Sequence, residues 1–285
     1  MDCKKFKVPC GKTIDLGAYS PRFTADLADK EAARDILRQD IEKLVKLQDV
    51  LYAYDKYAIL IILQAMDAAG KDGVIKHVMS GLNPQGCQVH SFKKPSEEEL
   101  DHDFLWRCQK ALPRRGHIGI FNRSYYEEVL VARVHPELLD SQKLPDISKK
   151  HVWQERYKDV NNFERYLTRN GVVIIKFFLN ISKHEQRARF IERIDSSEKN
   201  WKFSARDVAE REFWTQYMHA YEEMLGNTST PWAPWYIIPA DHKWFSRAAV
   251  ARIIVKNLKK LHLRYPSLSA AEQKKLRGAK KRLLA

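Results

Sequence analysis

The stretch AILIILQAMDAAGKDG, residues 58–73, decides the fold of this chain. Residues 58–63 form a continuous apolar run, whose length and β-branched content predict a strand buried on both faces. A loop of small residues follows and ends in Gly70-Lys71, and residues 74–79 read as a helix. A strand, a small-residue loop ending in Gly-Lys, and a helix are the context that a phosphate-binding P-loop requires.

The chemistry of this loop suits phosphate. Small residues let backbone N–H groups surround phosphate oxygens, the helix N-terminus adds partial positive charge, and Lys71 supplies a cation. The usual pattern, GxxxxGK[ST], is altered, since Ala65 replaces the first glycine and Asp72 replaces the hydroxyl that normally holds magnesium. Asp67 and Asp72 flank Lys71, which makes sense when a metal ion shares the site. The alternative is a plain strand–turn–helix with an exposed lysine.

Outward from this stretch, the chain repeats the same pattern of short apolar runs separated by helical periodicity. Further strands are predicted at 87–92, 118–122, 171–179 and 235–239, and helices at 29–54 and 151–167. Such alternation predicts βαβ units and a parallel sheet covered by helices on both sides. Ligands of such sheets bind at the carboxyl ends of the strands, so functional residues should follow each run.

Two later segments add candidate residues. Asn122 ends the third predicted strand, where P-loop enzymes face magnesium, and Arg123 stands ready to clamp a phosphate. Alternatively, Asn122 caps a helix that begins near Ser124. Arg189 and Arg193 share a helix face and precede a polar segment, which reads as a basic lid over phosphates. A solvated charged helix face is the alternative, and it is favoured on this segment alone.

Composition limits the partners. Among 285 residues, 50 Lys and Arg against 36 Asp and Glu give a net charge of +14, which attracts polyanions such as nucleic acid, an anionic membrane or a phosphate-rich substrate. No apolar run approaches the ~20 residues that cross a bilayer, and the first residues lack a signal peptide, so we expect a cytoplasmic protein. We divide the chain into an N-terminal arm (1–28), one domain (29–265) and a basic tail (266–285), which is either a solvated terminal helix or a polyanion tether.

Seven strings, in order, closely resemble the second family of polyphosphate kinases, over about Tyr52 to Leu261. They are QAMDAAGKDG, GLNPQG, SFKKPSEEEL, DFLWR, FNRSYYEEVLVARVHPE, IIKFFLNISKHEQ and APWYIIPAD. The resemblance implies a three-layer α/β/α P-loop fold like thymidylate kinase, with a five-stranded parallel sheet and a helical lid at about 187–210. It also implies reversible, Mg²⁺-dependent transfer of phosphate between polyphosphate and nucleotides.

The resemblance assigns roles to individual residues. Asp67, Lys71 and Arg123 are implied as catalytic, with Asp67 holding magnesium. The residues implied to bind phosphate are Ala68, Ala69, Gly70, Asp72 and Gly73 in the loop and Arg189, Arg193 and Lys202 in the lid. The residues expected to bind nucleotide are Asn122, Glu127 and Arg133.

Many members of that family carry FDRS where this chain has FNRS at 121–124. Asn122 together with Glu127 resembles the third class, whose members phosphorylate both nucleoside monophosphates and diphosphates. We therefore predict transfer from inorganic polyphosphate to AMP and ADP, with guanine nucleotides as possible further substrates, by a homo-oligomer that binds neither nucleic acid nor membrane. The alternatives are a polyphosphate kinase restricted to diphosphates, an ATP-dependent nucleoside monophosphate kinase, and a nucleic-acid-binding P-loop protein.

Overall fold

The structure is a computed structural model that describes residues 1–285 except 26, 28, 143 and 146–150, and leaves the side chain of Lys202 undescribed. Within this part of the chain, one five-stranded sheet has the order β2-β3-β1-β4-β5, with every neighbouring pair parallel. Its strands are β1 (Ala58–Gln64), β2 (Cys87–Ser91), β3 (Ile118–Asn122), β4 (Val172–Asn180) and β5 (Trp235–Pro239). The predicted parallel sheet and all five predicted strands are thereby confirmed.

The central strand β1 is buried along its whole length, as its unbroken apolar run predicted. Its register pairs Leu63 with Asn122 of β3 on one side and with Phe177 of β4 on the other. The carboxyl ends of β1 and β3 therefore lie side by side. The loops that follow these two strands meet at one edge of the sheet, where ligands bind in open α/β sheets.

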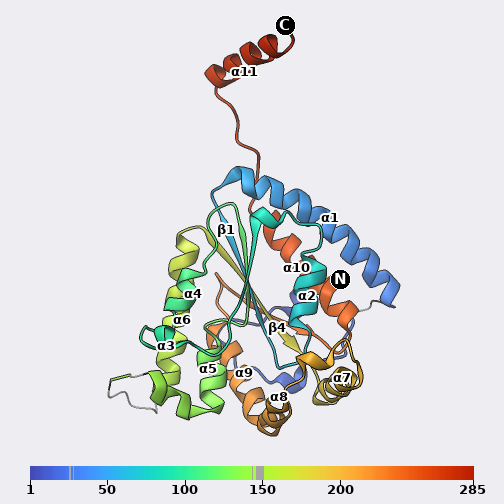
Figure 1. The fold of residues 1–285 in the computed structure, drawn as a ribbon, viewed down its shortest axis with the longest axis vertical. Coiled ribbons are helices and arrows are strands. Elements are labelled where there is room, and N and C mark those ends of the chain that lie inside the picture. Colours follow the sequence, from blue (N-terminus) through green and yellow to red (C-terminus); the bar gives the residue numbers. More distant parts are fainter. Residues whose placement is uncertain (26, 28, 143, 146–150) are drawn as a thin grey trace.

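Helices cover both faces of the sheet, which gives three layers (Figure 1). One face carries α1 (Lys30–Tyr54), α2 (Lys71–Val78) and α10 (Lys243–Lys259), and the other carries α4 (Trp106–Lys110), α5 (Glu127–Val134), α6 (Val152–Arg169) and α9 (Trp214–Thr228). The remaining α-helices are α3 (Glu97–Leu100), α7 (Lys183–Asp195), α8 (Ala205–Ala209) and α11 (Ala270–Leu283). The 3₁₀ helices are η1 (Cys3–Phe6), η2 (Leu16–Ala18), η3 (Pro84–Gly86), η4 (Pro136–Gln142), η5 (Asn200–Lys202) and η6 (Glu210–Phe213).

Local sequence explains most helix ends. Ser96 and Glu99 form a capping box at the start of α3, and Ser182 accepts from the Glu185 N–H at the start of α7. The helix predicted from residue 74 instead begins at Lys71, because Gly70 adopts the left-handed conformation (φ 105°) that turns the chain into it.

The alternative role of Asn122 as a helix cap is wrong. The helix predicted near Ser124 begins at Glu127, and its N-cap Tyr126 makes no side-chain capping bond. The Asn122 side chain instead donates to Asp72 and Ser91, so it points toward the segments after β1 and at the end of β2 rather than toward the start of α5.

The two ends of the chain differ in how they meet the body. The N-terminal segment packs on it, with Phe6 and Val8 buried and the Val8 N–H donating to the Trp235 carbonyl at 2.9 Å. In contrast, α11 is exposed along its whole length and projects from the body (Figure 1). Among the described residues, no helix combines the length and the apolar character needed to span a membrane.

Candidate active site

The loop between β1 and α2 wraps around the ammonium group of Lys71. Two residues of the loop, Ala68 (φ 60°) and Gly70 (φ 105°), have positive φ and bend the backbone sharply. Lys71 is the first residue of α2, and its Nζ donates to the carbonyls of Ala65 at 2.8 Å and Met66 at 3.4 Å. Burial, and then the nearby Arg123, lower the pKa of Lys71 to about 8.

Arg123, directly after β3, ties the ends of β1 and β3 together. Its backbone (φ 64°) is left-handed, and its N–H donates to the Leu63 carbonyl at 3.1 Å. Its guanidinium donates to Asp67 at 2.5 Å and to Glu127 at 3.0 Å. Gln64 also donates to Glu127, at 3.0 Å. The two carboxylates, Glu127 foremost, raise the pKa of Arg123, so this side chain is a permanent cation at the site.

Asn122 holds Asp72, the second carboxylate of the loop. Its Nδ2 donates to Asp72 at 2.8 Å, while its Oδ1 is buried with no hydrogen-bond partner. A buried oxygen without a donor next to a carboxylate is suited to a cation. In the described part of the chain, no three or more His, Cys, Asp or Glu side chains are grouped as a metal site. Magnesium, however, is often held by one or two carboxylates together with substrate phosphates, so this donor set fits it.

Arg189 on α7 lies beneath the loop and supports it. Its guanidinium donates to the carbonyls of Ala68 at 3.0 Å and Ala69 at 2.9 Å. It also donates to the carbonyls of Ala240 at 2.6 Å and Asp241 at 2.9 Å, and its Nε donates to Glu185 at 2.8 Å. All five N–H groups of this arginine are therefore used, and none is left for the phosphate contact expected from the lid sequence.

The other two residues expected in the lid, Arg193 and Lys202, follow Arg189 in the sequence. Arg193 pairs with Asp207 at 3.5 Å and stacks over Phe190. Burial, and then the charge of Asp67, raise the pKa of Asp207, so the segment after α7 returns toward the loop. The side chain of Lys202 falls outside what the structure describes.

Arg133, expected to bind nucleotide, lies on α5 beyond Glu127. It forms an ion pair with Glu223 of α9 and lies 5.8 Å from the ring centroid of Trp153 on α6. Its contacts are thus between helices, whereas Glu127 on the same helix reaches the loop. The structure brings together Asp67, Lys71, Asp72, Asn122, Arg123 and Glu127, and it places Arg133 in a helix interface.

Sequence reasoning missed two glutamines of the site. Gln64, the last residue of β1, positions Glu127, and Gln186 donates to the Asp67 carbonyl at 3.0 Å. Gln186 precedes Arg189 by three residues, so the two share a helix face. The helical spacing was a signal for Gln186, but nothing in the sequence indicated which face meets the loop.

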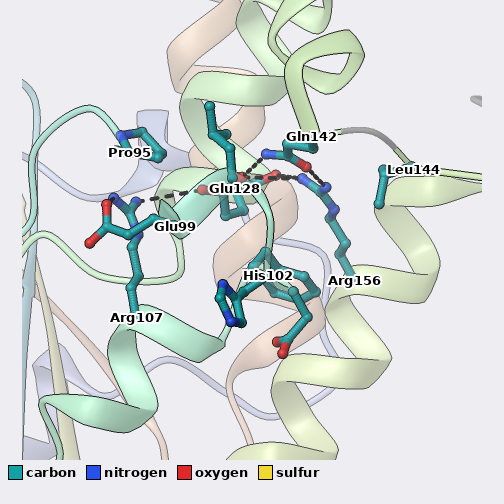
Figure 2. Close-up of a pocket in the computed structure, with 11 residues that line it drawn as sticks. Pro95, Glu99, His102, Arg107, Glu128, Gln142, Leu144 and Arg156 are labelled. Carbon is teal, nitrogen blue, oxygen red and sulfur yellow. Dashed lines mark hydrogen bonds and ion pairs between the residues drawn. The ribbon is translucent and has the colours of Figure 1, made fainter. Parts of the chain in front are cut away.

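Helix α5 is anchored on its far side from the loop. Figure 2 shows a small pocket there, in which Glu128 accepts from Gln142 at 2.6 Å and lies beside Arg156, whose Nη1 donates to the Glu128 carbonyl at 2.8 Å. Arg107 approaches Glu128 to 3.5 Å. Glu128 is thus paired with both Arg107 and Arg156, so these contacts fasten the first turn of α5 to the surrounding segments.

Comparisons with known proteins agree with this geometry. The family model described as Polyphosphate kinase 2 (PPK2) matches residues 27–265. The chain is 50% identical over 283 residues to an ADP-polyphosphate phosphotransferase of Rhodopseudomonas palustris, covering 99% of this chain and 98% of that protein. It is 43% identical over 272 residues to an AMP/ADP-polyphosphate phosphotransferase of Meiothermus ruber, covering 95% and 98%. The crystal structure of Polyphosphate Kinase 2 from Arthrobacter aurescens TC1 superposes with a TM-score of 0.87 at 38% identity, covering 96% of this chain and 95% of that one.

Proposed function

This chain belongs to the polyphosphate kinase 2 family, and we propose that it transfers phosphate from inorganic polyphosphate to both AMP and ADP. The observation that carries the proposal is the cluster of Lys71, Asp67, Arg123 and Glu127 at the adjoining ends of β1 and β3. Two relatives that match along nearly their whole length bear names of such phosphotransferases, one for ADP and one for AMP and ADP.

The terminal phosphates of the donor would bind in the loop. The Lys71 ammonium has three N–H groups and only two carbonyl acceptors, so one N–H can reach a phosphate oxygen. Arg123 is held between two carboxylates and adds a second cation at a defined position. Phosphoryl transfer needs little covalent chemistry from the protein, so fixed charges that stabilise the transferring group account for the catalysis.

Magnesium fits the carboxylates of this loop. Asp67 and Asp72, with phosphate oxygens, would hold the ion, which when bound neutralises phosphate charge. Arg123 keeps Asp67 oriented, and Asn122 does the same for Asp72. Metal binding by this protein is part of the proposal.

Acceptor choice would depend on Asn122 and Glu127. A neutral amide at position 122 donates to Asp72, whereas a carboxylate there would repel it across 2.8 Å. The neutral side chain therefore lowers the negative charge where acceptor phosphates gather. Glu127 fixes Arg123, and through it the position of the acceptor phosphate.

A product assay with polyphosphate and AMP or ADP, without ATP, tests this function. Wild type should convert AMP to ADP and then ATP. Asn122→Asp and Glu127→Ala should change the ratio of AMP to ADP rates, with AMP suffering more in Glu127→Ala, whereas the exposed control Glu42→Ala should not. A wild type inert toward AMP would leave a diphosphate-specific enzyme, and an absolute need for ATP would indicate a nucleoside monophosphate kinase. Use of guanine nucleotides, cytoplasmic location and homo-oligomeric assembly stay predictions.

A further inference from the structure

Most of the net positive charge of this chain lies at its C-terminal end. Residues 256–285, which we call the C-terminal basic segment, contain ten Lys and Arg against one acidic residue, Glu272. This segment has a net charge of +9, while the whole chain has +14, so the rest of the chain carries only +5. The charge that attracts polyanions is therefore concentrated outside the candidate active site.

The last helix of this segment is open to a ligand on every side. All residues of α11 are exposed, including Leu276 at 57% and Leu283 at 86%. A capping box of Ser269 and Glu272 starts the helix, which then projects from the body (Figure 1). Isolated helices of this length, 14 residues, are only marginally stable in water. A bound partner would therefore stabilise α11.

One side of α11 presents a row of cations. Lys274, Arg277 and Lys281 are three and four residues apart, so they lie on one face of the helix with about 5–6 Å between neighbouring Cβ atoms. The flanking cations are Lys275, Lys280 and Arg282. These spacings are shorter than the Debye length of about 10 Å at about 0.1 M salt, so the charges attract a linear polyanion together.

The C-terminal basic segment begins at the sheet edge opposite the phosphate loop. Helix α10 starts just after the carboxyl end of β5, and its 17 residues extend back over about 25 Å. It packs along α1, which ends where β1 begins. Figure 1 accordingly shows α11 beyond the end of the body that lies away from α7. A ligand of α11 is thus far from the residues that transfer phosphate.

The composition of α11 favours a linear inorganic anion over a membrane or a nucleic acid. Helices that lie on membranes combine a basic face with large apolar residues, among them Trp and Phe. Helix α11 has Leu276 and Leu283 but no aromatic residue, and Gly278 lies in its middle. Single-stranded nucleic acids are held largely by stacking on aromatic side chains, which α11 also lacks. Inorganic polyphosphate has no bases or apolar groups, so cations alone suffice to bind it.

We propose that α11, with the exposed cations that precede it in the C-terminal basic segment, is a tether for long-chain polyphosphate, separate from the site of phosphate transfer. The tether binds an internal part of the donor chain, while an end of the same chain reaches the phosphate loop. Binding at α11 makes binding at the loop intramolecular, which raises the local concentration of donor ends there. The inference rests on the proposed function, because it takes polyphosphate as the donor.

The triple variant Lys274→Gln/Arg277→Gln/Lys281→Gln tests the tether without disturbing any buried residue. At low salt its KM for long-chain polyphosphate should rise about tenfold, because the gain from linking two binding events is lost. The KM for tripolyphosphate and the kcat should stay within about twofold of wild type, since so short a donor does not span the ~25 Å of α10. At about 1 M salt the difference for long chains should disappear, because the Debye length falls to about 3 Å.

The matched control is Lys4→Gln/Lys12→Gln/Lys158→Gln, which removes the same charge from exposed positions on the body. Its KM for long-chain polyphosphate should stay within about twofold of wild type. An equal rise in this control would reduce the effect to overall charge and overturn the tether.

Other results would also overturn the tether. An unchanged KM for long chains in the α11 variant would show that the helix does not hold the donor, and an equal rise for tripolyphosphate would place the effect at the loop. Binding of wild type to vesicles of anionic lipid or to RNA that is lost in the variant, with an unchanged KM for long chains, would assign α11 to a membrane or a nucleic acid. If wild type used neither donor, the proposed function itself would fail, whereas loss of the tether alone leaves tripolyphosphate turnover intact.

Discussion

Two buried lysines, one in the loop and one within the sheet, differ in how completely their N–H groups are used. Lys176 on β4 is 0% exposed and donates to Glu164 at 2.6 Å, the Tyr126 hydroxyl at 2.8 Å and the Thr228 carbonyl at 2.8 Å. Lys71 is 9% exposed and donates to two carbonyls. An ammonium has three donors, so Lys176 is saturated and Lys71 is not.

This difference indicates that the charge of Lys176 serves the fold, whereas the charge of Lys71 remains available to a ligand. Burial lowers the pKa of both lysines, but Lys176 is compensated by Glu164, whereas the second-largest influence on Lys71 is the like charge of Arg123. The saturated cluster holds Tyr126, three residues after Arg123, and so fixes the segment that carries this arginine. The unsaturated lysine leaves its remaining N–H for a ligand.

The largest effect is expected for Lys71→Met. Loss of the cation should lower kcat by about 10³-fold, as for other fixed donors at a transition state. The pKa of Lys71 lies near 8 in the folded protein and at 10.5 ordinarily, so the folded state favours the charged form less than the unfolded state does. Removing the charge should therefore not lower the melting temperature. A folded variant with near-normal turnover would contradict the role of the loop.

Lys176→Met should show the opposite profile. It leaves the Glu164 carboxylate in the core without a counter-charge, accepting only from the Tyr125 and Tyr126 hydroxyls. This should lower the free energy of unfolding by about 3–5 kcal/mol in urea titrations. The double variant Lys176→Met/Glu164→Gln should recover much of that loss, because no buried charge remains. A Lys176→Met variant as stable as wild type would show that the ion pair between Lys176 and Glu164 does not stabilise the fold.

Asp67→Asn should lower kcat by about 10²-fold and raise the magnesium concentration needed for half-maximal rate. The carboxylate both orients Arg123 and offers a metal ligand, and the amide weakens both roles. Asp49→Asn, an exposed position on α1, is the matched control. An unaltered magnesium dependence in Asp67→Asn would restrict Asp67 to orienting Arg123.

The smallest effect is expected from pH. Because Lys71 must be charged to bind phosphate and its pKa is about 8, kcat/KM for polyphosphate should fall as pH rises through 8. Above this value the decline should approach about tenfold per pH unit. Lys176, which contacts no ligand in this scheme, should add no such step. A flat profile to pH 9.5 would show that another group carries the charge.

Much of this protein followed from local sequence. All five strands were predicted, and for β1, β3, β4 and β5 the reason is that a mainly apolar run between turns is stable in a buried parallel sheet. The edge strand β2 (Cys87–Ser91) is partly exposed and mixed in character. The loop and Arg123 were found because small residues, Gly-Lys and strand ends carry their chemistry locally. Asn122 was also found, but its bonds to Asp72 and Ser91 were not.

The sequence by itself determined which segments form strands, where the phosphate loop lies in the chain and which charged residues it contains. Only the tertiary structure decided which charges are saturated. Arg189 turned inward to the loop carbonyls, Arg133 paired with α9, and Arg247 came to lie beside Gly73. These contacts join residues far apart in sequence, and they depend on how whole helices pack on the sheet. Periodicity within one helix specifies its apolar face, but it does not specify which partner that face will meet.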